Sequence, residues 1–474
     1  MSTRPFLVNG EWRTGEGTLE VRSPFDSSVV AEIGVPTAAD VEEAVAVAAE
    51  TFKESQHLTV HARAEALDHI SRRLIEKIDE NATMIAAEGG KPLKWAKVEA
   101  TRAGSTFRWA SEVLRHGNDE LMRLDTEASF SGRLGLVRRF PYGPILGITP
   151  FNFPLNLVAH KVAPALAVGA PIVVKPASFT PIGSLVLAEL FAETDLPKGM
   201  YQVLPVNSKV ADGMARDERF RKISFTGSAE IGWYLKSIDP KKRVTLELGG
   251  NAGVIVHSDA DLDLAAARVA FGSYYQAGQS CISVQRILVA SEVYDDFAVR
   301  LTKQVESLKT GDPMDPTVDV GPVIERKEVD RIAAWVAEAV EQGAEILTGG
   351  KADGPFYYPT LLSQTTPQMK VRCEEIFGPV ATISPYQTFE EALEEVNNSK
   401  YGLQAGVFTN DLNRAFQAHR TLEVGGVIIN DASAFRADQM PYGGSKDSGF
   451  GREGLRFAME EMTEPRIMVL NVPL

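Results

Sequence analysis

Cysteine is scarce in this sequence, which has only Cys281 and Cys373 among its 474 residues. Two cysteines so far apart exclude a disulfide-stabilised scaffold and fit a reducing compartment, in which thiols stay free for chemistry. Histidine is scarce as well, and the seven histidines show none of the close spacing that metal ligands have. We therefore expect a cytoplasmic protein without a metal site.

Positive charge is in deficit, because 49 lysines and arginines face 63 aspartates and glutamates and leave a formal net charge of -14. Proteins that bind nucleic acid need a basic face, so we expect no nucleic acid partner. Long apolar runs are missing too: no window reaches the roughly 18 apolar residues of a membrane span. The segment Met1–Trp12 is polar where a secretory signal has an apolar core. We expect no membrane partner either.

The rest of the composition is that of a soluble globular enzyme, with 44% hydrophobic and 24% charged residues. A chain of this length can bury a sizeable core, and length alone predicts roughly two to four domains. It is large enough to contain a cofactor cleft.

Cys281 has the more unusual setting of the two cysteines, because it ends the run Gln276-Ala-Gly-Gln-Ser-Cys281. A free cysteine is usually a small buried hydrophobe, yet here small residues and an amide precede it and serines flank it. Glu247 lies earlier, in Leu246-Glu-Leu-Gly-Gly-Asn251. A thiolate can attack an electrophilic carbon, and a nearby carboxylate can activate the water that releases the covalent intermediate. The pair predicts acyl transfer through a thioester.

Cys373 has no comparable setting. It precedes Glu374-Glu-Ile-Phe-Gly-Pro379, where we interpret a carboxylate as the functional group and the cysteine as incidental.

Short β-branched runs alternate with amphipathic stretches between Pro171 and Glu247, which predicts a parallel sheet with crossover helices. Such a sheet binds ligands at the carboxyl ends of its strands, where helices begin. The run that ends at Phe225 continues into Thr226-Gly-Ser228 before a predicted helix, where free N–H groups and a hydroxyl could meet a phosphate. The predicted strands are 172–174, 201–204, 222–225 and 243–246, and the predicted helices are 184–192, 210–215 and 229–236.

A second cycle of helices and strands follows Gly249-Gly250 and predicts a second α/β domain. Thr388-Phe-Glu-Glu391 has the capping-box pattern that opens a helix, and 425–430 predicts another buried strand. Two extended segments, 129–140 and 465–473, either pair with each other or offer their edges to a second subunit, because unpaired strands are a liability. The other predicted elements are helices over 262–276, 293–308 and 328–342 and a strand over 287–290.

In their order and spacing, the motifs resemble those of the NAD(P)-dependent aldehyde dehydrogenase superfamily, from about Val8-Asn-Gly-Glu-Trp12 to the end of the chain. Any one motif is weakly specific, whereas the full set is highly specific. Besides the motifs around Glu247, Cys281 and Glu375, the set comprises Glu88-Gly-Gly-Lys-Pro92, Thr149-Pro-Phe-Asn-Phe-Pro154, Val174-Lys-Pro176, Phe225-Thr-Gly-Ser228, Pro441-Tyr-Gly-Gly-Ser-Lys446 and Ser448-Gly-Phe-Gly-Arg-Glu-Gly454.

The resemblance implies an α/β fold of the aldehyde dehydrogenase type. Its parts would be a Rossmann-type cofactor-binding domain over 1–122 and 142–248, a second α/β catalytic domain over 249–440, and a small β oligomerisation arm over 123–141 and 455–474. It also implies a homodimer or a homotetramer, and the sequence leaves open which of the two forms.

The resemblance implies catalytic roles as well. Cys281 would form a thiohemiacetal and, after hydride transfer, a thioester, and Glu247 would deprotonate the hydrolytic water. The side-chain N–H of Asn152, with the backbone N–H of Cys281, would stabilise the oxyanion. Glu247 favours the hydrolytic branch, because CoA-acylating members commonly lack this base. A CoA-acylating semialdehyde dehydrogenase and a catalytically retired binding or structural protein remain as alternatives.

The implied cofactor is NAD or NADP. Lys175 and Glu375 match the family residues that bind the two ribose units, Ser228 matches the residue at the pyrophosphate, and Phe377 would form a wall against the nicotinamide. The full set of implied cofactor-binding residues is Thr149, Pro150, Phe151, Lys175, Ser178, Phe225, Gly227, Ser228, Leu248, Gly249, Glu375 and Phe377.

The sequence departs from the family pattern at two places on the cofactor side. The segment 204–213 lacks the Gly-x-Gly that often follows the preceding strand, which puts the adenine-side contacts in doubt. Ser178 stands where many NAD-preferring members have a glutamate. Without that carboxylate a 2′-phosphate is not repelled, so the sequence favours NADP use.

The identity of the aldehyde stays open. The segments 434–438 and 452–454 look closest to the branch that acts on succinate semialdehyde, lactaldehyde and phosphorylated or phosphonylated small aldehydes. Arg436 could bind an anionic substrate tail or form a surface salt bridge. Arg102 and Arg108, which follow the Glu88 motif, are similar candidates.

Overall fold

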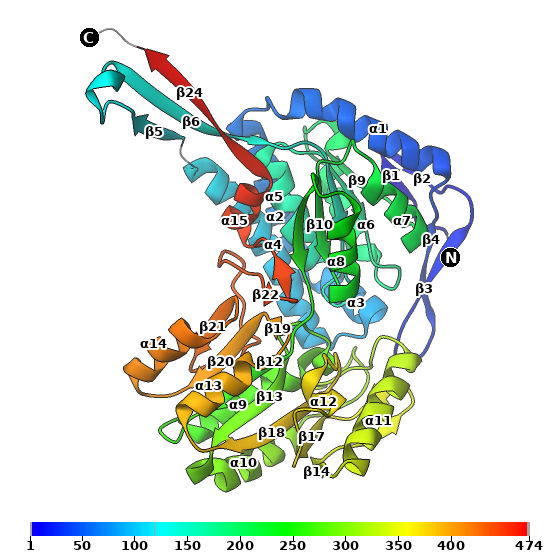
Figure 1. The fold of residues 1–474 in the computed structure, drawn as a ribbon. Helices are drawn as coiled ribbons and strands as arrows, with labels where there is room; N and C mark the ends of the chain where they lie inside the picture. The colour runs from blue at the N-terminus through cyan, green and yellow to red at the C-terminus, as the bar shows by residue number, and fades with distance from the viewer. Residues whose placement is uncertain (1, 118, 472–474) are drawn as a thin grey trace.

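Two α/β bodies and a projecting three-stranded arm make up the computed structural model, which describes residues 2–117 and 119–471 (Figure 1). Residues 1, 118 and 472–474, which the predicted domains and arm include, lie outside the described residues. Within the described part, no helix is both long and apolar enough to cross a membrane. The predicted α/β class is confirmed.

An eight-stranded sheet forms the centre of the larger body, and its middle strands run parallel. The order β9-β8-β7-β10-β11 reverses between β7 and β10, as it does in Rossmann sheets that bind dinucleotides. The middle strands are almost wholly buried because helices cover both faces of the sheet; β7 and β8 are nearly continuous apolar runs, whereas β10 and β11 alternate polar and apolar residues. From edge to edge the strands are β2 (Glu11–Arg13), β1 (Phe6–Val8), β9 (Tyr201–Val203), β8 (Ile172–Lys175), β7 (Ile145–Ile148), β10 (Lys222–Thr226), β11 (Arg243–Glu247) and β23 (Gly449–Phe450).

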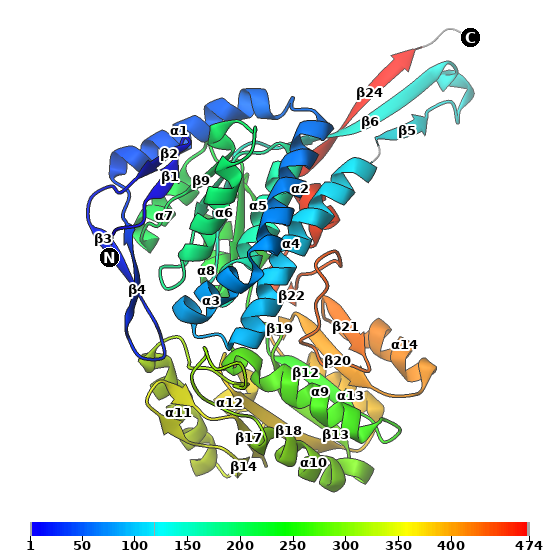
Figure 2. The same ribbon diagram turned by 180° about the vertical axis from the view of Figure 1, so that it is seen from behind.

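Helices α7 and α8 lie on the face of this sheet that is toward the viewer in Figure 1, and α2 and α4 lie on the opposite face, seen in Figure 2. Caps fix where several of them begin: Thr37 forms a capping box with Asp40, and Asn207 accepts from the Val210 N–H. The helices of this body are α1 (Ala38–Ser55), α2 (Val60–Glu76), α3 (Ile78–Gly89), α4 (Leu93–His116), α5 (Asn156–Val168), α6 (Ile182–Ala192), α7 (Ser208–Arg216), α8 (Ala229–Ile238) and α15 (Leu455–Glu461).

The smaller body has a seven-stranded sheet with an apolar cluster on each face. The capping box at Thr388 and Glu391 is present. Its strands in order are β14 (Glu345–Thr348), β17 (Thr360–Ser363), β18 (Val380–Tyr386), β13 (Val284–Ala290), β12 (Ala252–Val256), β20 (Gln404–Phe408) and β21 (Gly426–Ile429). Its helices are α9 (Leu262–Tyr274), α10 (Tyr294–Glu306), α11 (Arg326–Glu341), α12 (Lys370–Cys373), α13 (Phe389–Asn397) and α14 (Leu412–Thr421).

Two predicted elements of this body need correction. The strand expected to be buried over 425–430 is β21, which is half-buried or exposed because it lies at the edge of the sheet. The helix expected over 262–276 ends at Tyr274, because Gln276 and Ala277 adopt positive φ angles of 54° in the following 3₁₀ turn, Tyr275–Gly278.

The arm consists of β5 (Glu120–Arg123), β6 (Arg133–Pro141) and β24 (Thr463–Asn471). The two predicted extended segments do pair with each other: β24 runs antiparallel to β6 from Thr463 opposite Pro141 to Asn471 opposite Arg133. The expected start of the arm at 455 is wrong, because Leu455 of α15 and Met462 pack in the core of the larger body. The arm therefore leaves the body at Thr463.

Candidate active site

Cys281 lies between the 3₁₀ turn and β13, in a backbone of unusual conformation. Gln276, Ala277 and Gly278 all have positive φ, and a Cβ on Gly278 would collide with the Gly378 carbonyl. A non-glycine residue in this region costs on the order of 1–3 kcal/mol and persists only where surrounding contacts impose it. Here the Gln276 amide donates to the Asn152 carbonyl, and the Gln279 amide donates to the Gln276 carbonyl over 3.2 Å. These contacts hold the strained turn in place and so fix the position of the cysteine.

The Cys281 sulfur lies 3.0 Å from the Tyr442 hydroxyl. Burial raises the pKa of Cys281 to about 12, and the nearby Glu375 and Glu247 carboxyls act in the same direction. The hydrogen bond from Tyr442 and the charge of Arg436 act in the opposite direction and favour the thiolate. The resting side chain is therefore a thiol whose ionisation depends on these two neighbours.

Glu247 ends strand β11 and is buried. Neither of its carboxylate oxygens has a hydrogen-bond partner among the described residues. Burial, with the nearby Glu453 carboxylate, raises the pKa of Glu247 well above its ordinary value. A carboxyl with a raised pKa and free lone pairs can take a proton from water near neutral pH.

Asn152 follows strand β7 and contacts the turn that carries Cys281. Its side-chain N–H donates to the Gln279 carbonyl over 3.0 Å, and its side-chain oxygen is buried without a partner among the described residues. The amide assigned to the oxyanion thus lies beside the cysteine turn, although in this structure it bonds to a backbone carbonyl.

A cleft of about 690 Å³ opens at the carboxyl ends of β7, β8 and β10 and reaches Cys281, Glu247 and Asn152. Ser228 caps helix α8 without any side-chain hydrogen bond to that helix, so its hydroxyl is available at the positive end of the helix dipole. All the predicted cofactor-binding residues line this one cleft: Thr149, Pro150, Phe151, Lys175, Ser178, Phe225, Gly227, Ser228, Leu248, Gly249, Glu375 and Phe377.

The Glu375 carboxylate is held at the floor of this cleft. It accepts the Gly250 N–H over 2.8 Å, and a Cβ on Gly249 would collide with it, so only glycine allows this approach. Burial raises the pKa of Glu375 to about 7. Phe377 has a positive φ of 46° and packs edge-on against Phe151, with ring centroids 5.9 Å apart.

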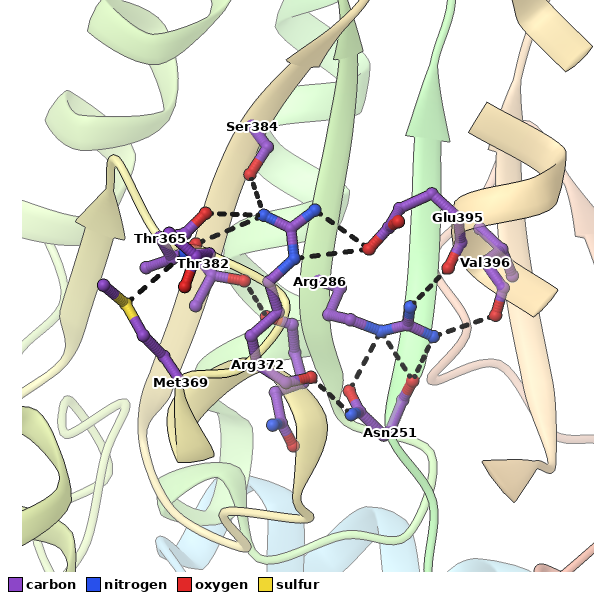
Figure 3. Close-up of polar contacts among 11 residues, drawn as sticks. Asn251, Arg286, Thr365, Met369, Arg372, Thr382, Ser384, Glu395 and Val396 are labelled. Carbon is purple, nitrogen blue, oxygen red and sulfur yellow. Dashed lines mark hydrogen bonds and ion pairs between the residues drawn. The ribbon is translucent and has the colours of Figure 1, made fainter. Parts of the chain in front are cut away.

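A buried polar cluster fixes the loop that carries Glu375 (Figure 3). Asn251 donates to the Arg372 carbonyl over 2.7 Å, and the Arg286 guanidinium donates to both Asn251 and the last turn of α13. The Arg372 guanidinium in turn bonds to the Glu395 carboxylate over 3.0 Å. These bonds tie the loop to the turn after Glu247, so the cluster sets the distance between Glu375 and Gly250.

A second, smaller cavity of about 220 Å³ lies on the other side of Cys281, which lines both spaces. Its walls are largely apolar, and six aromatic residues contribute to them: Trp95, Phe153, Phe271, Tyr275, Phe435 and Tyr442. Three arginines also line it: Arg102, Arg268 and Arg436. A short chain with a negative group would fit this combination of small volume and positive charge.

The three arginines predicted to bind an anion differ in their placement. Arg102 lines the cavity and forms an ion pair with Asp438 over 2.7 Å. Arg436 is buried and not on the surface, and it pairs with Glu453 over 3.1 Å. Arg108 lies outside the cavity, where its exposed guanidinium meets Glu112 over 3.3 Å.

Comparison with known proteins decides the class of this site. The model of the Aldehyde dehydrogenase family matches residues 12–468. The chain belongs to the aldehyde dehydrogenase family. This makes it an NAD(P)-dependent aldehyde dehydrogenase, and NAD or NADP is its cofactor. The Rossmann-type strand order and the lining of the larger cleft fit such a dinucleotide.

Three relatives of this dehydrogenase indicate its branch. A 3-sulfolactaldehyde dehydrogenase of Priestia aryabhattai is 44% identical over 98% of this chain and 97% of its own. A lactaldehyde dehydrogenase of Methanocaldococcus jannaschii is 37% identical over 98% of this chain and 100% of its own. The crystal structure of aldehyde dehydrogenase 21 from Physcomitrella patens, in complex with the reaction product succinate, superposes with a TM-score of 0.97 at 41% identity and covers 99% of both chains.

Two residues of the dehydrogenase's smaller cavity were missed in the sequence. Tyr442 stands in the Pro441 motif, but nothing in the sequence says that it meets Cys281. Arg268 precedes Phe271 on α9 by three positions, and this spacing places the two on one helix face. That periodicity was the available signal for Arg268, whereas Tyr442 had none.

Proposed function

We propose that this enzyme oxidises a short aldehyde with an anionic tail to its carboxylic acid, by way of a thioester on Cys281. The supporting observation is that Cys281 lines both cavities, one with the cofactor-binding motifs and one with three arginines. The names of the sulfolactaldehyde and lactaldehyde dehydrogenases and the succinate in the plant structure agree with a short, polar substrate.

In the acylation step the thiolate of Cys281 attacks the aldehyde carbon, and the carbonyl electron pair moves to the oxygen. The Asn152 side-chain amide and the Cys281 backbone N–H stabilise that oxyanion, because the amide has a second N–H besides the one that donates to the Gln279 carbonyl. The bound NAD(P) supplies the hydride acceptor that makes the step an oxidation. Lys175, Ser228 and Glu375 would hold it, because they line the larger cleft.

In the deacylation step Glu247 takes a proton from water, and the resulting hydroxide attacks the thioester carbon. The S–C bond breaks and the thiolate leaves. Glu247 has to be ionised for this step, and the charges of Arg436, Lys161 and Arg452 lower its pKa against the effect of burial. Glu247 lines the cleft, and a base in this position supports hydrolysis rather than transfer of the acyl group to CoA.

The substrate tail would lie in the smaller cavity. The Arg102 guanidinium uses two of its nitrogens on Asp438, and Arg268 uses two of its nitrogens on Asp431, so each keeps further N–H donors. Arginines that converge on a small aromatic cavity suit a carboxylate or a sulfonate. The cavity volume of about 220 Å³ restricts the substrate to a few carbons.

The arm gives the chain a means to form a homodimer or a homotetramer. Strand β24 is one of the two outer strands of the arm, and Ile467, Met468 and Val469 on it are about half exposed. An open apolar edge of this length is a site for pairing with another copy. Light scattering on the full chain should give at least twice the 51.6 kDa of one chain; a monomer would contradict this assignment.

A panel of aldehydes tests the proposed function. The panel would contain 3-sulfolactaldehyde, succinate semialdehyde, lactaldehyde and propanal, each with NAD and with NADP, followed by absorbance of the reduced cofactor at 340 nm. We expect the anionic aldehydes to exceed propanal in kcat/KM by at least about tenfold, which corresponds to ~1.4 kcal/mol. Equal values across the panel would contradict the anionic tail. Formation of acyl-CoA when CoA is added would instead support the acylating alternative.

A further inference from the structure

Tyr442 contacts the reacting sulfur, and no motif assigns it a role. We propose that Tyr442 is a further catalytic residue: its phenol O–H donates a hydrogen bond to the Cys281 sulfur and stabilises the thiolate. This inference rests on the proposed function, because it takes Cys281 as the nucleophile.

The phenol is fixed in place from both sides. Its oxygen lies 3.0 Å from the Cys281 sulfur, and the ring, which is 3% exposed, has the Arg436 guanidinium 3.6 Å from its centroid. Arg436 is held by Glu453, and Lys161 binds the same carboxylate over 3.0 Å. The Tyr442 backbone also pairs with that of Glu453. The hydroxyl is thus preorganised toward the sulfur.

The direction of the hydrogen bond follows from the charge on the sulfur. A thiolate carries no proton, so the phenol must donate once the cysteine ionises. A hydrogen bond to an ionised acceptor is stronger than one to a neutral acceptor. The same bond therefore favours the thiolate over the thiol.

The other groups around the sulfur do not supply this donor. The Glu375 and Glu247 carboxyls disfavour a negative sulfur. The Arg436 charge favours it, but the guanidinium lies over the face of the Tyr442 ring and has no hydrogen bond to the sulfur among the described residues. The Tyr275 hydroxyl lies 2.8 Å from the Ser280 hydroxyl, to which it donates. Within residues 2–117 and 119–471, Tyr442 is the side chain whose polar group meets the sulfur directly.

Tyr442 would act twice in each turnover. When the thiol ionises, the S–H bond breaks and its proton leaves to solvent, while the phenol keeps its own proton and donates to the sulfur. As the S–C bond forms, charge moves from sulfur to the carbonyl oxygen and the hydrogen bond weakens. When hydrolysis breaks the S–C bond, the electron pair returns to the sulfur and the phenol stabilises the leaving thiolate.

The test compares Tyr442→Phe with Tyr275→Phe, which removes a hydroxyl from the same cavity without touching the sulfur. The rate of alkylation by iodoacetamide would be followed against pH on the free enzyme. Mass spectrometry of the peptides separates Cys281 from the exposed Cys373. For Tyr442→Phe we expect alkylation about tenfold slower at each pH below the midpoint, since one pKa unit is a factor of ten. Tyr275→Phe should keep the original rates. Unchanged rates in Tyr442→Phe would overturn the proposal.

Two further measurements keep the result unambiguous. If Tyr442→Phe does not fold, NMR of the unmodified enzyme with isotope-labelled tyrosine gives a second readout. The chemical shift of the Tyr442 ring carbon should change as Cys281 ionises, and this change should be absent in Cys281→Ala. A chemical shift that does not depend on Cys281 would overturn the proposal. Alkylation of Cys281 should also abolish aldehyde oxidation. Full activity after alkylation would reject the proposed function itself, whereas lost activity with an unshifted profile would reject only the role of Tyr442.

Discussion

The two cavities that meet at Cys281 differ in size and in charge. The larger cleft, at about 690 Å³, opens at strand ends and at the N-terminus of α8, and the Glu375 carboxylate there accepts a backbone N–H. The smaller cavity, at about 220 Å³, brings three arginines and six aromatic rings close to the same sulfur. A cleft built at the strand ends of the fold suits a ligand that a whole family shares, whereas a cavity built from side chains can be changed one residue at a time. We therefore expect specificity for the aldehyde to depend on the smaller cavity.

Replacing Cys281, which lines both cavities, should lower the rate of aldehyde oxidation more than any other change considered. Cys281→Ala should lower aldehyde oxidation by at least about 10⁴-fold, because no other group can form the thioester. Cofactor affinity, measured by quenching of tryptophan fluorescence, should stay nearly unchanged, since the cleft keeps its other lining. Substantial turnover by the purified variant would rule out the mechanism.

The second-largest effect is expected for Glu247, whose replacement should slow deacylation and leave acylation intact. Glu247→Gln should still give a burst of about one reduced cofactor per active site, followed by turnover slower by about 10²- to 10³-fold. Because burial raises the pKa of Glu247, the base form appears only as pH rises, so hydrolysis-limited turnover should increase with pH in the unmodified enzyme and lose this increase in the variant. Loss of the burst as well would place Glu247 in acylation or in the fold.

A change in the substrate cavity should discriminate between aldehydes. Arg102→Leu should lower kcat/KM for an anionic aldehyde by about 10- to 100-fold more than for lactaldehyde, because it removes a cation from the cavity. Because both kcat/KM values are measured on the same variant, their ratio is unaffected by any loss of activity that arises from removing the arginine partner of Asp438. Arg108→Leu is the matched control on the same helix and should leave the ratio unchanged. Equal losses for both aldehydes in Arg102→Leu would show that the tail is bound elsewhere.

The smallest effect concerns the far end of the cofactor cleft. Ser178→Glu should move the kcat/KM ratio of NAD over NADP toward NAD by about tenfold, because a carboxylate there accepts from ribose hydroxyls and repels a 2′-phosphate. Asp212 on α7, in the segment without the Gly-x-Gly pattern, also lines the cleft and already carries a negative charge. Strict NAD dependence of the unmodified enzyme, or an unchanged ratio in the variant, would show that this segment decides the cofactor preference.

The cofactor side could be predicted from the sequence because its residues are local. Motifs at strand ends are contiguous, and short runs with β-branched residues alternate with amphipathic stretches, so the sequence locates β8, β10 and β11 to within a residue or two. The predicted residues of those motifs line one cleft. The end of α9 could not be predicted, because contacts of Gln276 and Gln279 with distant segments impose the positive φ angles there.

The substrate side could not be predicted in the same way, because it is assembled from segments that meet only in the folded chain. Its residues come from α4, the start of α5, α9, the cysteine turn and the segment 434–442. A simple periodicity argument would have separated two of the candidates: Arg102 and Arg108 are six positions apart, which is about 240° around a helix, so they cannot face the same cavity. The contact of Tyr442 with Cys281 joins two loops and leaves no pattern in the sequence.

The late segments of the chain complete what the early ones begin. The larger core starts at Phe6 and closes with Leu455 and Met462, after the whole smaller body has intervened, and Tyr442 and Glu453 reach the active site from the same late stretch. During synthesis, the first body emerges from the ribosome without the residues that close its core. The smaller body can fold as soon as it has emerged, whereas the larger one must wait. A nascent chain halted before α15 would therefore hold every predicted catalytic residue and still be inactive.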